Sequence, residues 1–219
     1  MTRRISDSVL DGATVLAALC AIVAVVLMVR GRGPTVLASP EDRELMGWDT
    51  LPERGHLVGN PEAGLTMTVF FDYECPFCAT LERTLDEAIE RFPEDFAVVF
   101  RHFPLSRHPN AYRTARAAEC AFQQGKFWEF HRQAFELDDY SERELVRLAS
   151  RVEVGNLGAF EECLSSIAPV PAIEEDLAVA HEFVFFGSPA LIVGNELSYH
   201  LPTVEEIEWR IRVMKEEAG

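Results

Sequence analysis

The order of hydrophobic and polar positions along the chain predicts an α/β domain. Residues 65–73 (LTMTVFFDY) are rich in β-branched and aromatic side chains, which is typical of a buried strand. From Pro76 onward an apolar residue recurs every three to four positions, and this period predicts a helix that Pro93 ends. Residues 96–105 (FAVVFRHFPL) predict a second strand. Because a helix connects the two strands, we expect them to be parallel.

Helical periodicity continues through most of residues 110–186 before strand patterns return. PALIVG (189–194) predicts another strand, residues 197–200 predict a short one, and a capping box of Thr203 and Glu206 opens a last helix. We therefore expect a helical insertion within the α/β domain. The predicted divisions of the chain are an N-terminal membrane anchor (1–32), a linker (33–55), the first part of the α/β domain (56–109), the helical insertion (110–186) and the second part of the domain (187–219).

The anchor is predicted from residues 12–29, which contain no charged side chain and have about the length that a helix needs to cross a bilayer. A cleaved signal peptide is the alternative, with Ala38 as a poor candidate for the cleavage site. Signal peptides usually have shorter apolar regions, whereas here Arg30 and Arg32 follow the segment directly. Arginines flank both ends, so charge alone does not decide the orientation of the predicted span.

Length and charge limit the classes of function. The 219 residues give room for one sizeable core, and the formal net charge of −16 disfavours binding to nucleic acid.

The candidate chemistry is a pair of cysteines, Cys75 and Cys78, at the predicted junction between a strand and a helix. A thiol at the start of a helix faces unpaired N–H groups and the positive end of the helix dipole, which favour the thiolate. We therefore predict that Cys75 is a solvent-facing nucleophile of low pKa and that Cys78, one turn inside the helix, is a shielded resolving thiol. A passive bridge and half of a zinc site are the alternatives. A short CxxC loop constrains little chain entropy, and no second CxxC or close histidine pair completes a zinc site.

Three segments resemble the DsbA-like thiol:disulfide oxidoreductases of the thioredoxin superfamily. They are FFDYECPFC, RHFPLSRHPNAYRTARAAECAFQQGKFWEFH and GSPALIVGN, which are similar to that family's active site, the start of its helical insert and its cis-proline loop. The resemblance covers about residues 56–215 and implies a thioredoxin fold with an inserted helical domain. It also implies that Pro189 is a cis-proline beside the active site, where the Ser188 backbone pairs with an extended peptide. A trans proline that opens a strand is the alternative.

The sequence departs from the family's strongest oxidants at two places. Pro76 and Phe77 separate the cysteines, and Phe77 stands where those relatives have a histidine, so extreme oxidising power is not implied. Val69 stands six positions before Cys75, where relatives often bury an acid, and Asp72 is the nearest carboxylate. Two hypotheses for Asp72 remain open: a carboxylate at a strand end or turn, and a group that reaches the thiols.

Other residues with reactive side chains are assigned to structure. We expect Cys20 to be an apolar filler in the anchor, whereas Cys120 and Cys163 are either a structural disulfide or two buried free thiols. For His102, His108 and His131 we expect packing or helix-capping roles. Three aromatic residues are expected in the core: Phe127, Trp128 and Phe130.

Together with the predicted anchor, the resemblance implies a membrane-anchored extracytoplasmic enzyme that donates the Cys75–Cys78 disulfide to cysteine-containing secreted or membrane proteins. The expected redox partner is a quinone-linked membrane oxidase of the type the family uses. No cofactor, metal or nucleic acid is expected, and the chain is expected to be a monomer. Two alternatives share these motifs: a disulfide reductase of the same fold, and a non-catalytic peptide-binding module with a chaperone-like role.

Overall fold

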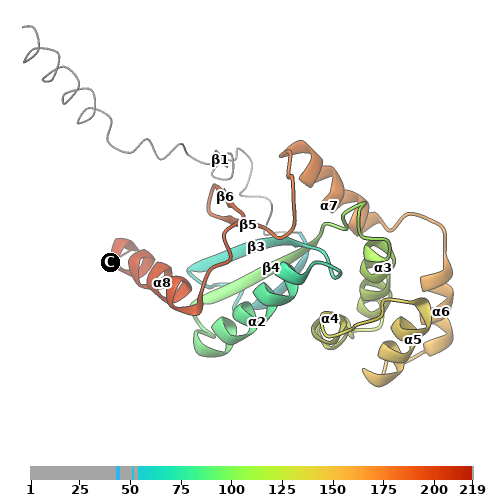
Figure 1. Cartoon of the computed structure of the whole chain (residues 1–219). Coiled ribbons are helices and arrows are strands. Elements are labelled where there is room, and N and C mark those ends of the chain that lie inside the picture. Colours follow the sequence, from blue (N-terminus) through green and yellow to red (C-terminus); the bar gives the residue numbers. More distant parts are fainter. Residues whose placement is uncertain (1–42, 45–50, 52–53, 219) are drawn as a thin grey trace, which may run out of the picture. The chain divides into compact units, whose positions relative to one another are not determined.

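The computed structural model describes residues 43–44, 51 and 54–218, which are drawn in colour in Figure 1. All of them belong to one compact unit, Glu41–Gly219. The predicted anchor, Cys20 within it and most of the predicted linker lie outside the described residues. Among the helices that are described, none combines the length and the apolar character needed to cross a bilayer.

A mixed sheet forms the centre of the unit, with strand order β1-β6-β5-β3-β4-β2. β3 and β4 are parallel, as predicted, and Leu65 lies opposite Phe96 at the start of the pair. The other neighbouring strands are antiparallel. The strand bounds are β1 Arg43–Glu44, β2 His56–Gly59, β3 Leu65–Phe71, β4 Phe96–His102, β5 Ala190–Val193 and β6 Glu196–Ser198.

α2 (Pro76–Arg91) and α8 (Val204–Ala218) lie along one face of this sheet, and five more helices lie between β4 and β5 in the chain. α2 connects β3 to β4, and α8 packs against α2 and β3. The predicted capping box opens α8: Thr203 N donates to Glu206 Oε2 at 2.8 Å, and Glu206 N donates to Thr203 Oγ1 at 3.3 Å. Between the strands come α3 (Ala111–Phe122), α4 (Phe127–Ala134), α5 (Glu142–Arg151), α6 (Leu157–Ser165) and α7 (Pro171–Glu182).

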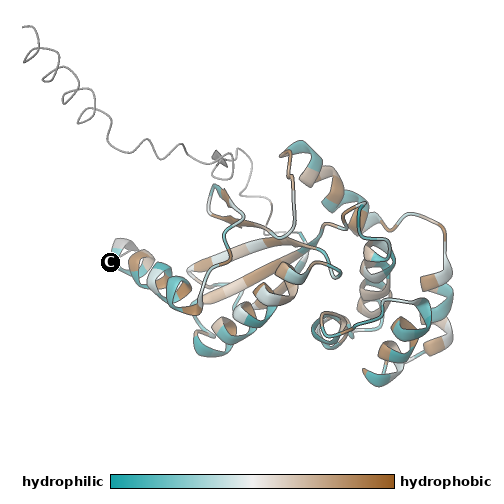
Figure 2. Cartoon of the chain, viewed as in Figure 1, coloured by the Kyte–Doolittle hydropathy of each residue, from teal (hydrophilic) through white to brown (hydrophobic). Residues whose placement is uncertain are grey.

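The inserted helices form one group of four and one separate helix. α3, α4, α5 and α6 pack on one another at one end of the sheet, whereas α7 returns to pack on β4. Figure 2 shows brown and teal alternating along these helices, as expected when one face of each helix is buried. A disulfide joins Cys120 of α3 to Cys163 of α6, with the two Cα atoms 5.9 Å apart.

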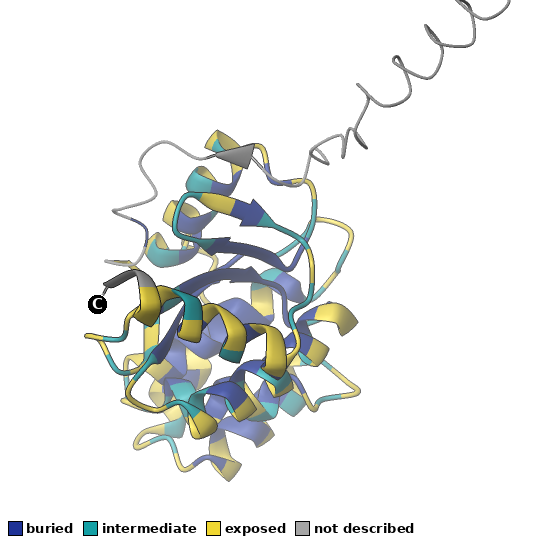
Figure 3. Ribbon diagram, turned by 90° about the vertical axis from the view of Figure 1, so that its left-hand side faces the viewer, coloured by how far each residue is buried: buried dark blue, intermediate teal, exposed yellow. Residues whose placement is uncertain are grey.

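The side chains of β3 alternate between two hydrophobic cores, one on each face of the sheet. Val69 and Phe71 belong to the larger core, which α2, α8 and the insertion cover, and which includes Phe127 and Phe130. Phe70 belongs to a smaller core with Ala180 and Phe185 on the other face. Figure 3 shows the sheet strands mostly in dark blue inside the unit. β3 therefore has both faces covered, and its end at Phe71 delivers the next residues to a fixed position.

One strained backbone position gives a stability prediction. Val184, just after α7, has a φ of 56° and is 64% exposed, and this left-handed conformation is costly for a β-branched residue. We expect Val184→Gly to stabilise the chain by about 1 kcal/mol, because glycine adopts this φ without the steric cost. Thermal unfolding should show a midpoint about 2–4 °C higher.

The matched control is Glu153→Gly. Glu153 is also exposed and has a φ of 57°, but its side chain is not β-branched. We expect a smaller gain in this variant. An unchanged midpoint in Val184→Gly, or an equal gain in both variants, would contradict the assignment of the strain to the branched side chain.

Candidate active site

The loop between β3 and α2 carries both cysteines of the CxxC motif. Cys75 is the N-cap of α2, and Pro76 stands at the first helical position, where no N–H is required. The Cys75 N–H donates to the Asp72 carbonyl at 3.1 Å, and the Ala79 N–H donates to the Cys75 carbonyl at 3.2 Å. Cys78 lies within the first turn of the helix. The backbone therefore holds the Cys75 sulfur at the end of α2.

Both cysteines are free thiols and each is only 2% exposed. The prediction of a solvent-facing Cys75 is therefore wrong for this state. The reason is the loop before β5: the Cys75 thiol donates to the Ser188 carbonyl at 3.2 Å, so this loop covers it. Phe77, between the cysteines, is instead 61% exposed.

The two thiols differ in their acidity. A hydrogen bond from the Cys78 thiol, assisted by the N–H groups of Cys78 and Phe77 and opposed by burial, lowers the pKa of Cys75 to about 6. Burial, reinforced by the neighbouring Cys75, raises the pKa of Cys78 well above its ordinary value. At neutral pH the reduced pair therefore holds a thiolate at Cys75 and a thiol at Cys78, and the bond that Cys75 donates to the Ser188 carbonyl belongs to the protonated form.

Ser188 contacts both sulfur atoms. Its carbonyl accepts from Cys75, and its hydroxyl lies 3.0 Å from the Cys78 sulfur and 3.5 Å from the Phe70 carbonyl. The Ser188–Pro189 bond is cis. We expected the Ser188 backbone to be free for a peptide, but in this state its carbonyl binds the Cys75 thiol. The contact of the hydroxyl with Cys78 was not predicted, because 110 positions separate the two residues.

The three residues before Cys75 are each bound to the insertion or to the loop that leads into it. The Tyr73 carbonyl accepts from the Tyr140 hydroxyl at 2.7 Å, and the Tyr73 hydroxyl lies 2.9 Å from Nδ1 of the buried His131. The carboxylate of Glu74 accepts from the Asn110 backbone at 2.6 Å and from its side-chain amide at 3.1 Å. These bonds fix the segment that places the nucleophile, and no sequence motif indicates them.

Asp72 is bound to the loop between β4 and α3. Its side chain is fully buried, and its carboxylate accepts from the Leu105 N–H and from His108 Nδ1, both at 2.8 Å. Burial raises the pKa of Asp72 above its ordinary value, against the effect of these hydrogen bonds. No hydrogen bond joins the carboxylate to either thiol among the described residues. His108 is thus the partner of a carboxylate rather than a packing residue.

One group of described residues has the donor atoms and spacing to hold a metal ion: His56, His102 and Glu119. Nε2 of His56 and Nε2 of His102 lie 2.6 Å and 2.8 Å from the same carboxylate oxygen. A metal-bound imidazole needs an acceptor for its other N–H, yet His102 Nδ1 is buried with no partner in the described region. Although burial opposes it, the bonds from His102 and His56 lower the pKa of Glu119 to about 2. The group fits a carboxylate held by two imidazoles better than a metal centre.

Comparison with known proteins places this geometry in a family. A family model described as thioredoxin matches residues 52–212. The chain belongs to the thioredoxin family. A thioredoxin-like oxidoreductase from Silicibacter pomeroyi DSS-3 shares the fold with a TM-score of 0.69 and 24% identity, over 78% of this chain and 99% of that one. The thiol-disulfide exchange protein alpha-DsbA2 from Wolbachia pipientis has a TM-score of 0.67 and 16% identity, over 76% and 91% of the two chains.

The family match confirms that the sequence belongs with the thioredoxin proteins, and the two solved structures share its fold. Among curated relatives, the Na(+)/H(+) antiporter NhaA 1 of Mycolicibacterium gilvum (strain PYR-GCK) is 44% identical over 100 residues. The match covers 45% of this chain and 16% of the antiporter. Because the chain spans so small a part of this relative, no antiporter activity is carried over.

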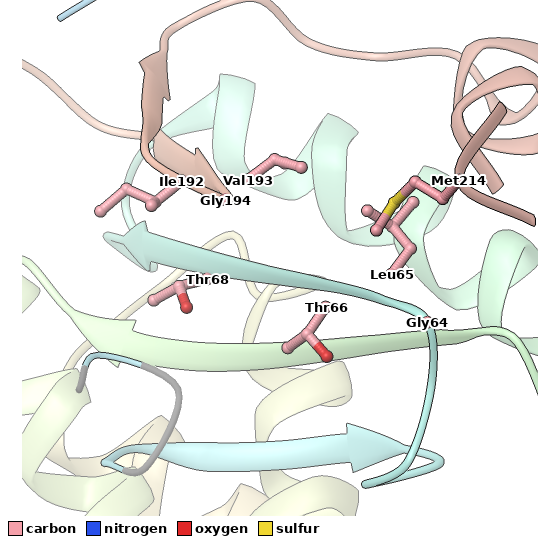
Figure 4. A pocket seen from close by; sticks show the side chains of 8 residues that line it. All are labelled: Gly64, Leu65, Thr66, Thr68, Ile192, Val193, Gly194 and Met214. Atoms are coloured by element: carbon pink, nitrogen blue, oxygen red, sulfur yellow. The ribbon is translucent and has the colours of Figure 1, made fainter. Parts of the chain in front are cut away.

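The pocket in Figure 4 is separate from the cysteine pair. It has a volume of about 300 Å³ and lies at the start of β3, where Thr66, Thr68 and Ile192 of β5 line it. Met214 of α8 lines it beside Leu65, on the other side of β3 from the two threonines. The cysteines follow the other end of β3. The candidate chemistry of this chain therefore lies in the CxxC loop rather than in this pocket.

Proposed function

We propose that the chain is an extracytoplasmic oxidase that donates the Cys75–Cys78 disulfide to proteins with free thiols. The observation that carries this proposal is the opposite shift of the two thiols, with the pKa of Cys75 lowered to about 6 and that of Cys78 raised. A fold that stabilises the Cys75 thiolate favours the dithiol state, so the oxidised pair readily accepts electrons.

The reaction takes two steps. A substrate thiolate attacks the Cys75 sulfur, a mixed disulfide forms, and the Cys78 sulfur leaves and takes up a proton. A second substrate thiolate then attacks the substrate sulfur of this mixed disulfide, and Cys75 leaves as a thiolate. The substrate loses two electrons and two protons; the cysteine pair gains both electrons and one proton, and the other proton is released to solvent.

The pKa of Cys75 sets how strongly its thiolate stabilises the reduced form of the pair. Its pKa falls from an ordinary 9.0 to about 6, so the thiolate stabilises the folded reduced form fully above pH 9 and loses this contribution as pH falls through 6. At pH 7 the contribution is about 1.4 kcal/mol, or about 30 mV for a two-electron couple. Cys78 is protonated at pH 7 in both folded and unfolded chains, so it does not offset this term.

Exposed aromatic side chains support a polypeptide substrate. Phe77 beside the thiols and Phe186, two positions before Ser188, are each 61% exposed. The Phe186 ring lies 4.0 Å from the Tyr199 ring, centroid to centroid, which fixes its position. Apolar side chains near a substrate cysteine gain binding energy on such rings. Unfolded chains expose such side chains, so they are the proposed substrates.

Anchoring, localisation and partners form a further part of the proposal. Residues 12–29 have the composition of a single membrane span, and an oxidising disulfide persists only outside the cytoplasm. We therefore place the CxxC domain on the extracytoplasmic side, with secreted or membrane proteins as substrates. A quinone-linked membrane oxidase would restore the disulfide.

The deciding experiment compares the two directions of exchange with the full-length protein. We expect the oxidised protein to form disulfides in a reduced, unfolded test protein faster than the reduced protein cleaves the disulfides of insulin. Faster insulin reduction would support a reductase instead. The reductase is the chief alternative because Phe77 stands where the strongest oxidants have a histidine. If the protein is active in neither direction, the result would support the non-catalytic peptide-binding module.

A further inference from the structure

The buried Asp72 touches both cysteines through its backbone. Its N–H donates to the Cys78 sulfur at 3.5 Å, and its carbonyl accepts from the Cys75 N–H at 3.1 Å. Its side chain is fully buried. A carboxylate in this position disfavours a second negative charge close by, and its charge is one of the influences that raise the pKa of Cys75. The net charge at Asp72 therefore affects formation of the Cys75 thiolate.

Three groups hydrogen-bond the Asp72 carboxylate in the described part of the chain, and one of them can carry a charge. The Glu74 and Leu105 N–H groups are neutral donors at 2.8 Å. The imidazole of His108, also at 2.8 Å, can bind a proton, and its side chain is 20% exposed. His108 thus connects a fully buried charge to solvent.

We propose that His108 is a positioning residue that balances the buried charge of Asp72 with a proton from solvent and so makes the Cys75 thiolate depend on external pH. This inference rests on the proposed thiol chemistry of the pair. When His108 is protonated, imidazolium and carboxylate form a neutral pair, and ionisation of Cys75 meets no net charge. When His108 is neutral, the carboxylate charge is unbalanced and opposes that ionisation.

The other titratable groups near the pair are the two cysteines, Glu74, Tyr73 and Tyr140. Burial, followed by the charges of Glu74 and Asp72, raises the pKa of Tyr140 to about 12, and burial also raises that of Tyr73. Both tyrosines therefore stay neutral while Cys75 titrates. The Glu74 carboxylate is bound by Asn110, and within the described region no hydrogen bond joins it to the Asp72 carboxylate or to a thiol. Among these groups, His108 is the one that both hydrogen-bonds the Asp72 carboxylate and can carry a positive charge.

Two variants should move the Cys75 titration in opposite directions. His108→Gln keeps an N–H donor for Asp72 but cannot become charged, so the thiolate midpoint should rise by about half a pH unit. Asp72→Asn removes the buried charge, so the midpoint should fall by about one pH unit. The double variant should behave like Asp72→Asn, because His108 acts only through that carboxylate.

The measurement is the ultraviolet thiolate absorbance of the reduced protein against its oxidised form, from about pH 4 to 9, with a thermal melt of each variant to confirm folding. His200→Gln is the matched control. His200 also pairs with a carboxylate, Glu206 at 3.1 Å, but its side chain is 69% exposed and it contacts no residue of the site. We expect its midpoint to equal that of the wild type.

A purely structural role for His108 would lower the melting temperature without an upward shift of the midpoint. Superimposable titrations of the wild type and a folded His108→Gln would overturn the inference. The inference would also be overturned if His108→Gln shifted the thiolate midpoint equally in the wild type and in Asp72→Asn. Because the titration needs no substrate, it stays informative if the exchange assay fails, and the two failures are distinguishable.

Discussion

Cys78→Ser is expected to accumulate mixed disulfides with substrate proteins, whereas Cys75→Ser is expected to form none and to show exchange at the background rate. The two residues are equally buried, at 2% exposure each, so exposure does not separate them. The difference lies in their charge, because Cys75 is the thiolate and Cys78 the thiol at neutral pH. Without Cys78, a disulfide between Cys75 and substrate has no internal thiol to resolve it.

Cys78→Ala provides a sharper control for the origin of this asymmetry. The hydrogen bond from Cys78 is the largest cause of the low pKa of Cys75. A serine hydroxyl can replace that donor, whereas alanine cannot. We expect Cys78→Ala to form adducts more slowly than Cys78→Ser at pH 7, and the difference to vanish above about pH 9, where Cys75 ionises in both. The test protein carries disulfides, so the Cys75 thiolate attacks a substrate disulfide, a mixed disulfide forms and the other substrate sulfur leaves as a thiolate. Non-reducing electrophoresis of these adducts measures both effects. Adducts that form on Cys75→Ser but not on Cys78→Ser would show that Cys78 is the nucleophile and Cys75 the resolving thiol.

The local parts of this site are predictable because short-range physics decides them. The β-branched and aromatic residues of 65–73 and the helical period after Pro76 place two cysteines at a strand-to-helix junction, and the structure has this junction between Phe71 and Pro76. Helix capping by Cys75 follows from the same short stretch. Burial of Cys75 does not, because the covering carbonyl belongs to Ser188, 113 positions away.

The partners of the buried polar groups are likewise set by tertiary packing. Asp72 pairs with His108, 36 positions downstream, and Glu119 pairs with His56, 63 positions upstream. Nothing in the spacing of these residues indicates contact, because the insertion must first fold against the sheet. A histidine read from sequence as a packing residue can therefore be the partner of a buried charge, as His108 is.

The loop before Pro189 couples substrate access to the thiols. Its Ser188 carbonyl accepts from Cys75 and its hydroxyl lies beside Cys78. An incoming extended peptide would pair with this backbone by strand addition. Its arrival would replace the Cys75 bond to Ser188, so peptide binding and exposure of the sulfur become one event.

Loss of the Cys120–Cys163 disulfide should have the second largest effect, on stability rather than chemistry. The bridge closes a sequence separation of 43 residues between α3 and α6. Loop-closure entropy of the unfolded chain predicts a stabilisation of about 4 kcal/mol for a loop of this length. We expect Cys120→Ala with Cys163→Ala to lower the thermal midpoint by about 8–16 °C. Alanine is the better replacement because Cys120 is only 1% exposed and a serine hydroxyl there would be buried.

Reduction of the native bridge tests the same energy without changing the core. The CxxC pair must first be removed, so the background is Cys75→Ala with Cys78→Ala, in which a reductant acts on Cys120 and Cys163 as the only bridged pair of the described chain. Reductant should lower the midpoint of this background by about as much as the double alanine variant does, and should leave that variant unchanged. The insertion holds Tyr73 and Glu74 beside Cys75. Loss of the Cys120–Cys163 disulfide in a protein with an intact CxxC pair should therefore also slow thiol–disulfide exchange. Peptide mapping that finds both cysteines as free thiols in the untreated protein would refute the bridge.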